Sequence, residues 1–189
     1  MKKILITTAL LAAGTLAQAE LVTYAIDPTH TFVTFEAKHF GTSTLRGRFD
    51  KKEGSVTIDR AAKTGKADIT IDVGSVSTGV GPLDGHLKSK DFFNAADNAS
   101  ARFVGDKFTF DGTKVASVAG TLTMLGKTMP ATLNATHFNC YDHPMLKREV
   151  CGGDFETTIQ RSQWGMDYGV KMGLPDSIRL LVQIEAVKQ

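Results

Sequence analysis

Apolar and polar residues alternate along most of the chain after residue 20. Alternation with a period of two is typical of strands that bury one face and expose the other. Six runs show it clearly, at 31–39, 45–50, 67–73, 118–124, 131–136 and 178–185. Shorter candidates span residues 22–26, 55–59, 101–110 and 154–160. The pattern predicts an all-β chain of about ten strands.

Turn signals separate these runs and leave little room for helices. Asp111-Gly112 is a hairpin signal, and Gly126-Lys127 separates two alternating runs at hairpin distance. One helical stretch is expected from Leu83 to Phe93, and a shorter one at 162–166. Strands with one apolar face form a sandwich or a closed barrel, and closure removes exposed strand edges. We therefore expect an antiparallel β-barrel with a short helical insert near its mouth.

The interior of such a barrel is either filled by side chains or open to a ligand. Small residues recur at the apolar positions, for example Ala37, Gly47 and Ala67, and they leave space. Large neighbours such as Phe35 and Phe49 fill space. The pattern leaves both alternatives open.

The first nineteen residues differ from the rest of the chain. Lys2 and Lys3 precede an apolar stretch, and Ala17-Gln18-Ala19 follows it. This order is that of a secretory signal peptide, and the apolar part is too short to span a membrane. We expect cleavage after Ala19, export to the periplasm, and a single domain over residues 20–189. Without Lys2 and Lys3 the charges balance, at 20 Lys+Arg and 20 Asp+Glu, which gives no electrostatic case for nucleic acid or for anionic lipid surfaces.

Two cysteines, Cys140 and Cys151, are the only ones in the chain. An even number in an exported protein favours a disulfide. A thiolate metal site is the competing interpretation.

Four stretches together resemble the YceI family of exported lipid-binding proteins, and they span almost the whole mature chain. They are 24–30 with its continuation to 49, 86–93, 120–130, and 159–166 followed by 178–186. The resemblance implies an extended, lipocalin-like antiparallel barrel with an elongated apolar pocket for polyisoprenoid chains such as quinones or their precursors. Two features depart from the usual pattern: Trp164 stands where Phe is more common, and the segment from Cys140 to Cys151 marks a subgroup.

The parity of each residue, meaning which of the two alternating faces of its strand it occupies, and the resemblance together suggest a pocket lining. The inward strand positions and the aromatic or methionine residues of the two inserts are Val33, Phe35, Ala37, His39, Leu45, Gly47, Phe49, Ile69, Ile71, Phe92, Phe93, Trp164 and Met166. Parity also places His39, and less clearly His137, among the apolar set. A histidine there is either hydrogen-bonded core or a contact to the polar head of a ligand.

Arg161 is the charged residue that parity directs inward, where an unpaired guanidinium would be costly. Asp91 on the helical insert is the expected partner. The pair would either clamp the insert to the barrel or contact a ligand head group.

The preferred function is binding, transport or storage of an isoprenoid or similar long-chain lipid in the periplasm. No catalytic residue, metal site or cofactor is expected besides the bound lipid, and the oligomeric state stays open, a homodimer included. One alternative is an enzyme acting on a small amphiphile, with His39 or Arg161 as candidate groups. Another is a ligand-free interaction module in envelope stress.

Overall fold

The computed structural model of the protein describes residues 21–189 and confirms the all-β prediction. The expected signal peptide and its cleavage site lie outside the described residues. The strands of the described part are β1 Val22–Ile26, β2 Phe32–His39, β3 Ser43–Phe49, β4 Lys52–Asp59, β5 Thr64–Asp72, β6 Val76–Ser77, β7 Ser100–Asp111, β8 Lys114–Met124, β9 Lys127–Asp142, β10 Glu149–Gln160 and β11 Ser177–Lys188. The helix is α1, Gly81–Lys88, and short 3-10 turns span Val73–Ser75, Arg161–Trp164 and Val170–Met172.

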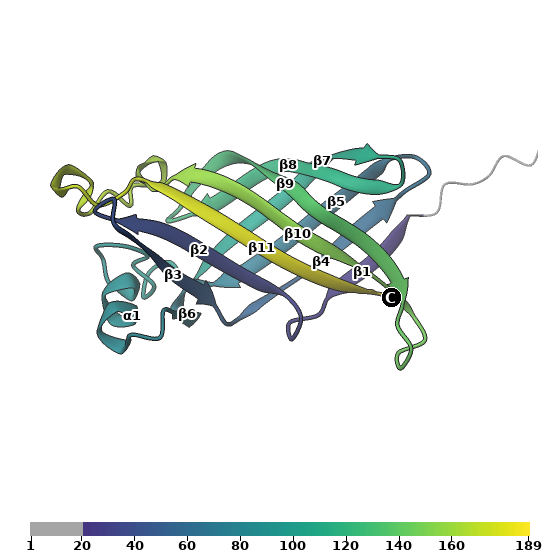
Figure 1. Cartoon of the computed structure of the whole chain (residues 1–189), viewed down its shortest axis with the longest axis horizontal. Coiled ribbons are helices and arrows are strands. Elements are labelled where there is room, and N and C mark those ends of the chain that lie inside the picture. Colours follow the sequence, from purple (N-terminus) through teal and green to yellow (C-terminus); the bar gives the residue numbers. More distant parts are fainter. Residues whose placement is uncertain (1–20) are drawn as a thin grey trace, which may run out of the picture.

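The strands close into an elongated antiparallel barrel (Figure 1). The ring runs β1-β4-β5-β7-β8-β9-β10-β11 and returns to β1, because β11 pairs with β1 as well as with β10. Strands β2, β3 and β6 extend the sheet from the other half of β11. Closure pairs the edges that would otherwise stay exposed.

The corner between β1 and β2 allows β11 to change partner. Ala186 of β11 pairs with Ile26 of β1, whereas Gln183 pairs with Phe32 of β2. Between them, the Glu185 carbonyl accepts hydrogen bonds from the Asp27 amide and from the hydroxyl of buried Thr31. The Thr31 hydroxyl also accepts the Glu185 N–H. One side chain thus satisfies backbone groups that lose their strand partner, as buried polar groups require.

The predicted alternation decides which side chains face the barrel interior. Along β5, Ala67, Ile69 and Ile71 are buried, while Lys66 is exposed and Asp68 is half-buried. The buried positions of all strands form one core cluster that continues into α1 and the turn at Trp164.

The helical insert is shorter than predicted. Helix α1 begins with Pro82 in its first turn and ends at Lys88, since Ser89 is extended. The Phe93 amide then donates to the Leu87 carbonyl, so the chain folds back instead of continuing to Phe93 as a helix. The expected helix from Leu83 to Phe93 was therefore wrong in its C-terminal half.

A bulge in β9 changes which residues face inward. Phe155 of β10 pairs with Ala135, but Asp154 pairs with His137, so Thr136 is an extra residue. The extra residue reverses the alternation beyond it. His137 is therefore exposed, and the weaker expectation that it faces inward was wrong.

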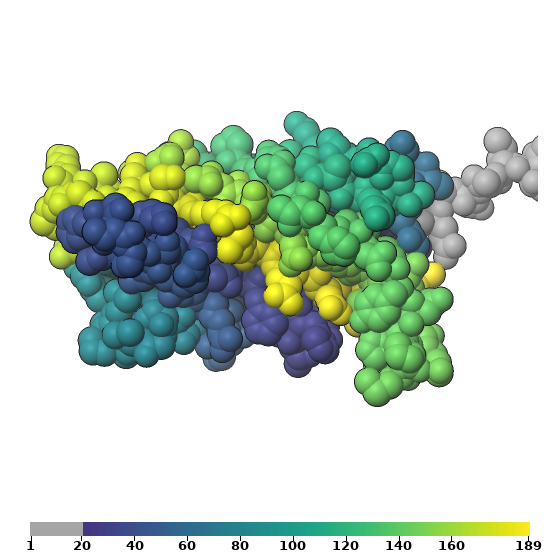
Figure 2. Space-filling model, viewed as in Figure 1, coloured from purple at the N-terminus to yellow at the C-terminus, as the bar shows by residue number. Residues whose placement is uncertain are grey.

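The two ends of the barrel differ. At one end lie the β2–β3 turn, α1 and the loop after Trp164, at the left of Figure 1. At the other end the β9–β10 hairpin protrudes from the body, as the green lobe at the lower right of Figure 2 shows. We call the first end the mouth.

Candidate functional site

The barrel interior contains two apolar chambers that share part of their walls. The outer chamber, toward the mouth, has a volume of about 370 Å³, and the inner one about 120 Å³. Val33, Ile71, Leu122 and Leu180 line both, so the chambers lie end to end. Their size together is that of a small-molecule binding site.

The outer chamber contains most of the residues predicted to line a pocket. Those in its wall are Val33, Phe35, Ala37, His39, Leu45, Phe49, Ile71, Phe92, Phe93 and Met166. The chamber reaches the surface, because its wall includes His39 and Tyr168, which are both exposed. His39 is therefore a residue of the opening rather than of the core, and its ring packs against Phe40 at 4.8 Å.

The inner chamber is lined by strand residues from around the barrel. Ile69, which was expected in the pocket lining, faces this chamber together with Phe103, Phe155 and Val182. Its wall is almost wholly aliphatic and aromatic, with Thr31 and Thr157 as the polar side chains besides Tyr24. Such a wall favours an apolar chain over a polar group.

Aromatic rings narrow the opening of the outer chamber. His86 of α1 packs edge-on against Phe92 and Tyr168, with ring centroids 5.0 and 5.1 Å away. The His86 Nε2 and an Asp91 carboxylate oxygen lie 2.8 Å apart. This contact holds the ring between α1 and the loop that carries Tyr168.

The predicted pairing of Arg161 with Asp91 was wrong, because Asp91 pairs with His86. The guanidinium instead donates to the backbone carbonyls of Pro175, Met166 and Tyr168, each at 2.8 Å. Arg161 is 4% exposed, and its burial lowers its pKa. The charges of Asp176 and Asp167 raise the pKa but do not outweigh the effect of burial. Arg161 clamps the mouth loop, residues 165–176, through backbone oxygens, and it lies over the Phe92 ring at 5.6 Å.

Trp164 was predicted to line the pocket, but it is part of neither interior wall of the described barrel. The β9–β10 ladder ends at Asn134 and Glu156, although both strands continue toward the mouth. An outer groove follows this split, and Trp164 lies in it with 1% of its surface exposed. Its indole N–H donates to the Leu122 carbonyl of β8 at 3.0 Å. The tryptophan therefore seals the wall where the strands separate.

Gly47 was predicted to line the pocket as well, and it is likewise absent from the walls of both described chambers. It pairs with Phe35 across β2 and β3. The Phe35 ring covers it, because a Cβ built on Gly47 would lie 2.3 Å from Phe35 Cζ.

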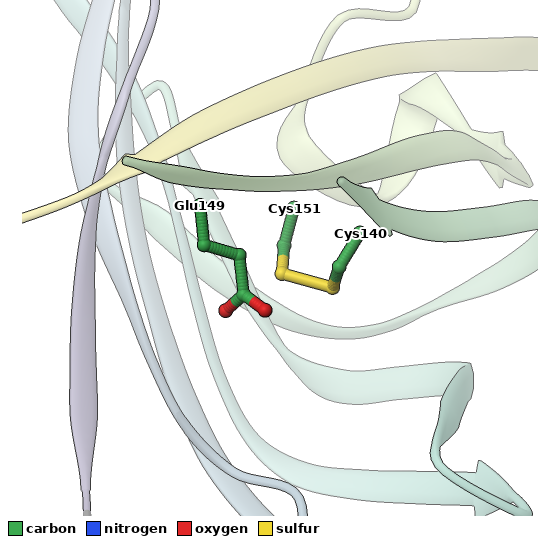
Figure 3. A group of neighbouring side chains, drawn as sticks. All are labelled: Cys140, Glu149 and Cys151. Atoms are coloured by element: carbon green, nitrogen blue, oxygen red, sulfur yellow. A yellow bond between two sulfur atoms is a disulfide. The ribbon is translucent and has the colours of Figure 1, made fainter. Parts of the chain in front are cut away.

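The inner end of the cavity is closed by a polar group and a disulfide. Glu149 accepts hydrogen bonds from the Tyr24 hydroxyl and from Arg60, whose Nη2 lies 2.7 Å from one carboxylate oxygen. Burial raises the pKa of Glu149, but these hydrogen bonds outweigh it and the net pKa is lowered. Cys140 and Cys151 are opposite each other on β9 and β10 and form the predicted disulfide beside Glu149 (Figure 3). Cys140, Glu149 and Cys151 are close enough to hold a metal ion, but both sulfur atoms are bonded to each other.

Several cavity residues were missed by the sequence analysis. In the outer chamber, Ala101, Leu122, Met124, Ile159, Ile178 and Leu180 have the apolar parity of their strands, so extending the same rule would have found them. The remaining ones lie in the helix and the mouth loop, where no period applies; they are Leu83, His86, Leu87, Tyr168, Leu174 and Pro175.

Among residues 21–189, none of the helices has the length and hydrophobicity that crossing a membrane requires.

Comparisons with known proteins agree on one family. The YceI-like domain family matches residues 24–186. A UPF0312 protein of Pseudomonas aeruginosa (strain LESB58) is 34% identical over 193 aligned positions, which cover 97% of this chain and 98% of that protein. The solved structure of the Campylobacter jejuni YCEI protein is 27% identical and superimposes with a TM-score of 0.69, covering 80% of this chain and 90% of the other.

A more distant solved structure has the same fold. It is described as a polyisoprenoid binding domain from Saccharophagus degradans implicated in plant cell wall breakdown. It is 17% identical, with a TM-score of 0.63 over 88% of this chain and 98% of the other. The matched family covers nearly the whole described barrel, and this chain belongs to the YceI-like domain family.

Proposed function

We propose that this protein binds a long-chain isoprenoid lipid, such as a quinone or a polyprenyl compound, in the periplasm. The observation that carries the proposal is the two-chamber apolar cavity, which reaches the surface at the mouth. Each buried methylene contributes about 0.8 kcal/mol, so a long chain needs few polar contacts. The polyisoprenoid binding domain with the same fold supports this ligand class.

The distribution of polar groups suggests how the ligand lies. In the outer chamber, His39, His86 and Tyr168 bring groups able to bond a polar head close to the opening. The inner chamber offers an apolar wall instead. We therefore propose that the chain enters first and that the head remains at the mouth.

The same geometry favours a binding protein over an enzyme. The Arg161 guanidinium, a candidate group for catalysis, is engaged by three backbone carbonyls. His39 is exposed at the opening and packs against Phe40. Transport or storage of the lipid is the role that this cavity would serve.

Mass spectrometry of organic extracts tests the proposal. The protein should be purified gently from the periplasm, without detergent, and we expect an isoprenoid at close to one per chain. The intact mass of the purified protein should correspond to a chain that begins at Glu20. A protein that yields no lipid, and that binds no fluorescent isoprenoid after extraction, would contradict the function.

A further inference from the structure

The mouth of the barrel displays apolar side chains outside the cavity. Phe40 lies in the β2–β3 turn, Val80 precedes α1, and Met172 lies in the mouth loop; all three are exposed. Neither chamber of the described barrel is lined by any of them. They come from three separate segments that meet at one end of the molecule (Figure 1).

Contacts among these segments form the rim of the opening. A Cβ on Gly173, next to Met172, would lie 3.3 Å from the Phe40 ring. Tyr168 of the same loop contacts His86 of α1. Phe40 and Met172 therefore lie beside the entrance through which a cavity ligand passes.

Four lysines flank this rim, although Lys+Arg and Asp+Glu balance over residues 20–189. Lys38, Lys88, Lys90 and Lys171 are exposed at the mouth end. Within residues 21–189, none of these four lysines forms an ion pair with a carboxylate.

Acidic residues lie at the same end, and hydrogen bonds from neutral groups leave their charge in place. Asp84 accepts hydrogen bonds from Thr78, Asp91 contacts His86, and Asp176 accepts from Ser162. Asp167 is an exposed acid of the mouth loop. Lysines without an ion pair beside exposed apolar residues are the combination that binds anionic lipid surfaces.

We propose that the mouth rim, Phe40, Tyr168 and Met172 with its flanking lysines, docks onto an anionic membrane surface. Apolar side chains enter the interface between head groups and acyl chains, and lysines contact the anionic head groups. The entrance of the outer chamber then faces the bilayer. Given the proposed isoprenoid ligand, the chain passes between membrane and cavity without crossing water.

The opposite end of the barrel supplies a matched control. Met145, at the tip of the β9–β10 hairpin, is 82% exposed, and Met172 is 65% exposed. Each has an exposed lysine close by in sequence, Lys147 and Lys171. The two sites share their chemistry, but the hairpin lies at the end of the barrel opposite the mouth (Figure 2).

Flotation with vesicles of phosphatidylcholine, with and without phosphatidylglycerol, measures the docking. We expect binding only with phosphatidylglycerol, and weaker binding at high salt. Met172→Ser and Phe40→Asn should each lower the partition coefficient about tenfold, and Lys171→Gln about fivefold. Met145→Ser and Lys147→Gln should leave it unchanged. Asparagine suits position 40, whose φ is 48°.

Other outcomes would overturn the proposal. They are an absence of vesicle binding, an equal loss in rim and hairpin variants, and a rim-dependent dimer in solution that does not bind vesicles. The last result would assign the rim to a second copy of the chain. Isoprenoid binding in solution should persist in Met172→Ser, because Met172 is outside both chambers; vesicle binding without isoprenoid binding would contradict only the proposed function.

Discussion

The Phe35 ring occupies the space in which a side chain at Gly47 would lie. The two residues pair across β2 and β3, and a Cβ at position 47 would be 2.3 and 2.6 Å from two ring carbons. It would also lie 3.0 Å from the Thr78 methyl group. Glycine is thus required here so that Phe35 can lie flat against the barrel wall and leave the outer chamber open.

A side chain at Gly47 should therefore cost stability as well as cavity volume. We expect Gly47→Ala to lower the free energy of unfolding by about 1–3 kcal/mol, because the ring must leave its position. Displacement of the ring into the chamber should also weaken isoprenoid binding. Urea denaturation and titration with a fluorescent isoprenoid measure the two effects.

A substitution at Ala37 tests whether a larger side chain blocks the outer chamber, which a substitution at Gly47 cannot test because it also displaces Phe35. Ala37 lines the outer chamber, so Ala37→Leu should extend into empty volume. We expect isoprenoid affinity to fall at least about tenfold, with a change in unfolding free energy below about 1 kcal/mol. Ala116→Leu, at an exposed position of β8, is the control and should change neither quantity. Unchanged affinity in Ala37→Leu would show that the ligand does not use this chamber.

The alternation of apolar residues was sufficient to predict the strands and much of the cavity wall. Val33, Phe35, Ile69 and Ile71 face the interior because a pleated strand directs every second side chain to the same face. The alternation does not show when a large side chain covers a smaller neighbour. Gly47 was misplaced for this reason, because the Phe35 ring covers it. It also fails at Thr136, where one extra residue reverses the faces.

Residues in loops could not be placed by any period. Trp164 lies at the end of the 3-10 turn that follows β10. Its location depends on the separation of β9 from β10 near the mouth, which is a feature of the tertiary structure. The partner of Arg161 was inferred from charge, whereas the structure satisfies the guanidinium with backbone oxygens of a loop. A sequence does not show which carbonyls a loop leaves unpaired.

Substitution of Arg161 should loosen the mouth loop. Hydrogen bonds to a charged group contribute about 1.5–3 kcal/mol each, so Arg161→Met should lower the free energy of unfolding by about 3 kcal/mol or more. Hydrogen exchange should increase first in residues 165–176. Arg161→Lys should restore little, because one ammonium cannot reach three carbonyls in that geometry.

Asp91→Asn is the companion variant for Arg161. The Asp91 carboxylate contacts His86, which is partly exposed, so we expect a loss below about 1 kcal/mol and normal exchange in the mouth loop. Lost isoprenoid affinity in Arg161→Met with an unchanged unfolding midpoint would instead assign Arg161 to the ligand head.

The disulfide should stabilise the protruding hairpin. It joins opposed residues of β9 and β10 at a sequence separation of 11. Closing a loop of this length contributes about 2–3 kcal/mol. We expect the Cys140→Ala, Cys151→Ala double variant to unfold at lower urea and to be cleaved by protease between Tyr141 and Arg148.

Reduction of the parent protein provides the control for that variant. The chain has two cysteines, so dithiothreitol acts on this bond alone. Reduced parent and double variant should have the same unfolding midpoint. Stoichiometric thiol labelling of the untreated, denatured protein would contradict the disulfide.

The Asp27–His30 contact in the β1–β2 corner should make stability depend on pH. Hydrogen bonds from His30 and Thr29 lower the pKa of Asp27 to about 2. This pKa lies below the value of about 3.9 in the unfolded chain. The contribution of Asp27 to the free energy of unfolding is therefore fully present above about pH 3.9 and is lost as pH falls through about 2. The Asp27 side chain raises the pKa of His30. The contribution of His30 is therefore complete below the unfolded value of about 6.5 and is lost as pH rises through the raised pKa.

The two titrations define a window in which the pair stabilises the corner. Between about pH 4 and 6.5 both groups are charged, and the Asp27 amide holds the Glu185 carbonyl of β11 in the same corner. The parent should exceed Asp27→Asn in unfolding free energy most within this window. The difference should shrink toward pH 2 as Asp27 is protonated, and toward alkaline pH as His30 loses its charge. Because His30 is exposed, added salt should weaken the effect. A difference that stays constant from pH 2 to pH 9 would mean that Asp27 acts only through its uncharged contacts with Thr29.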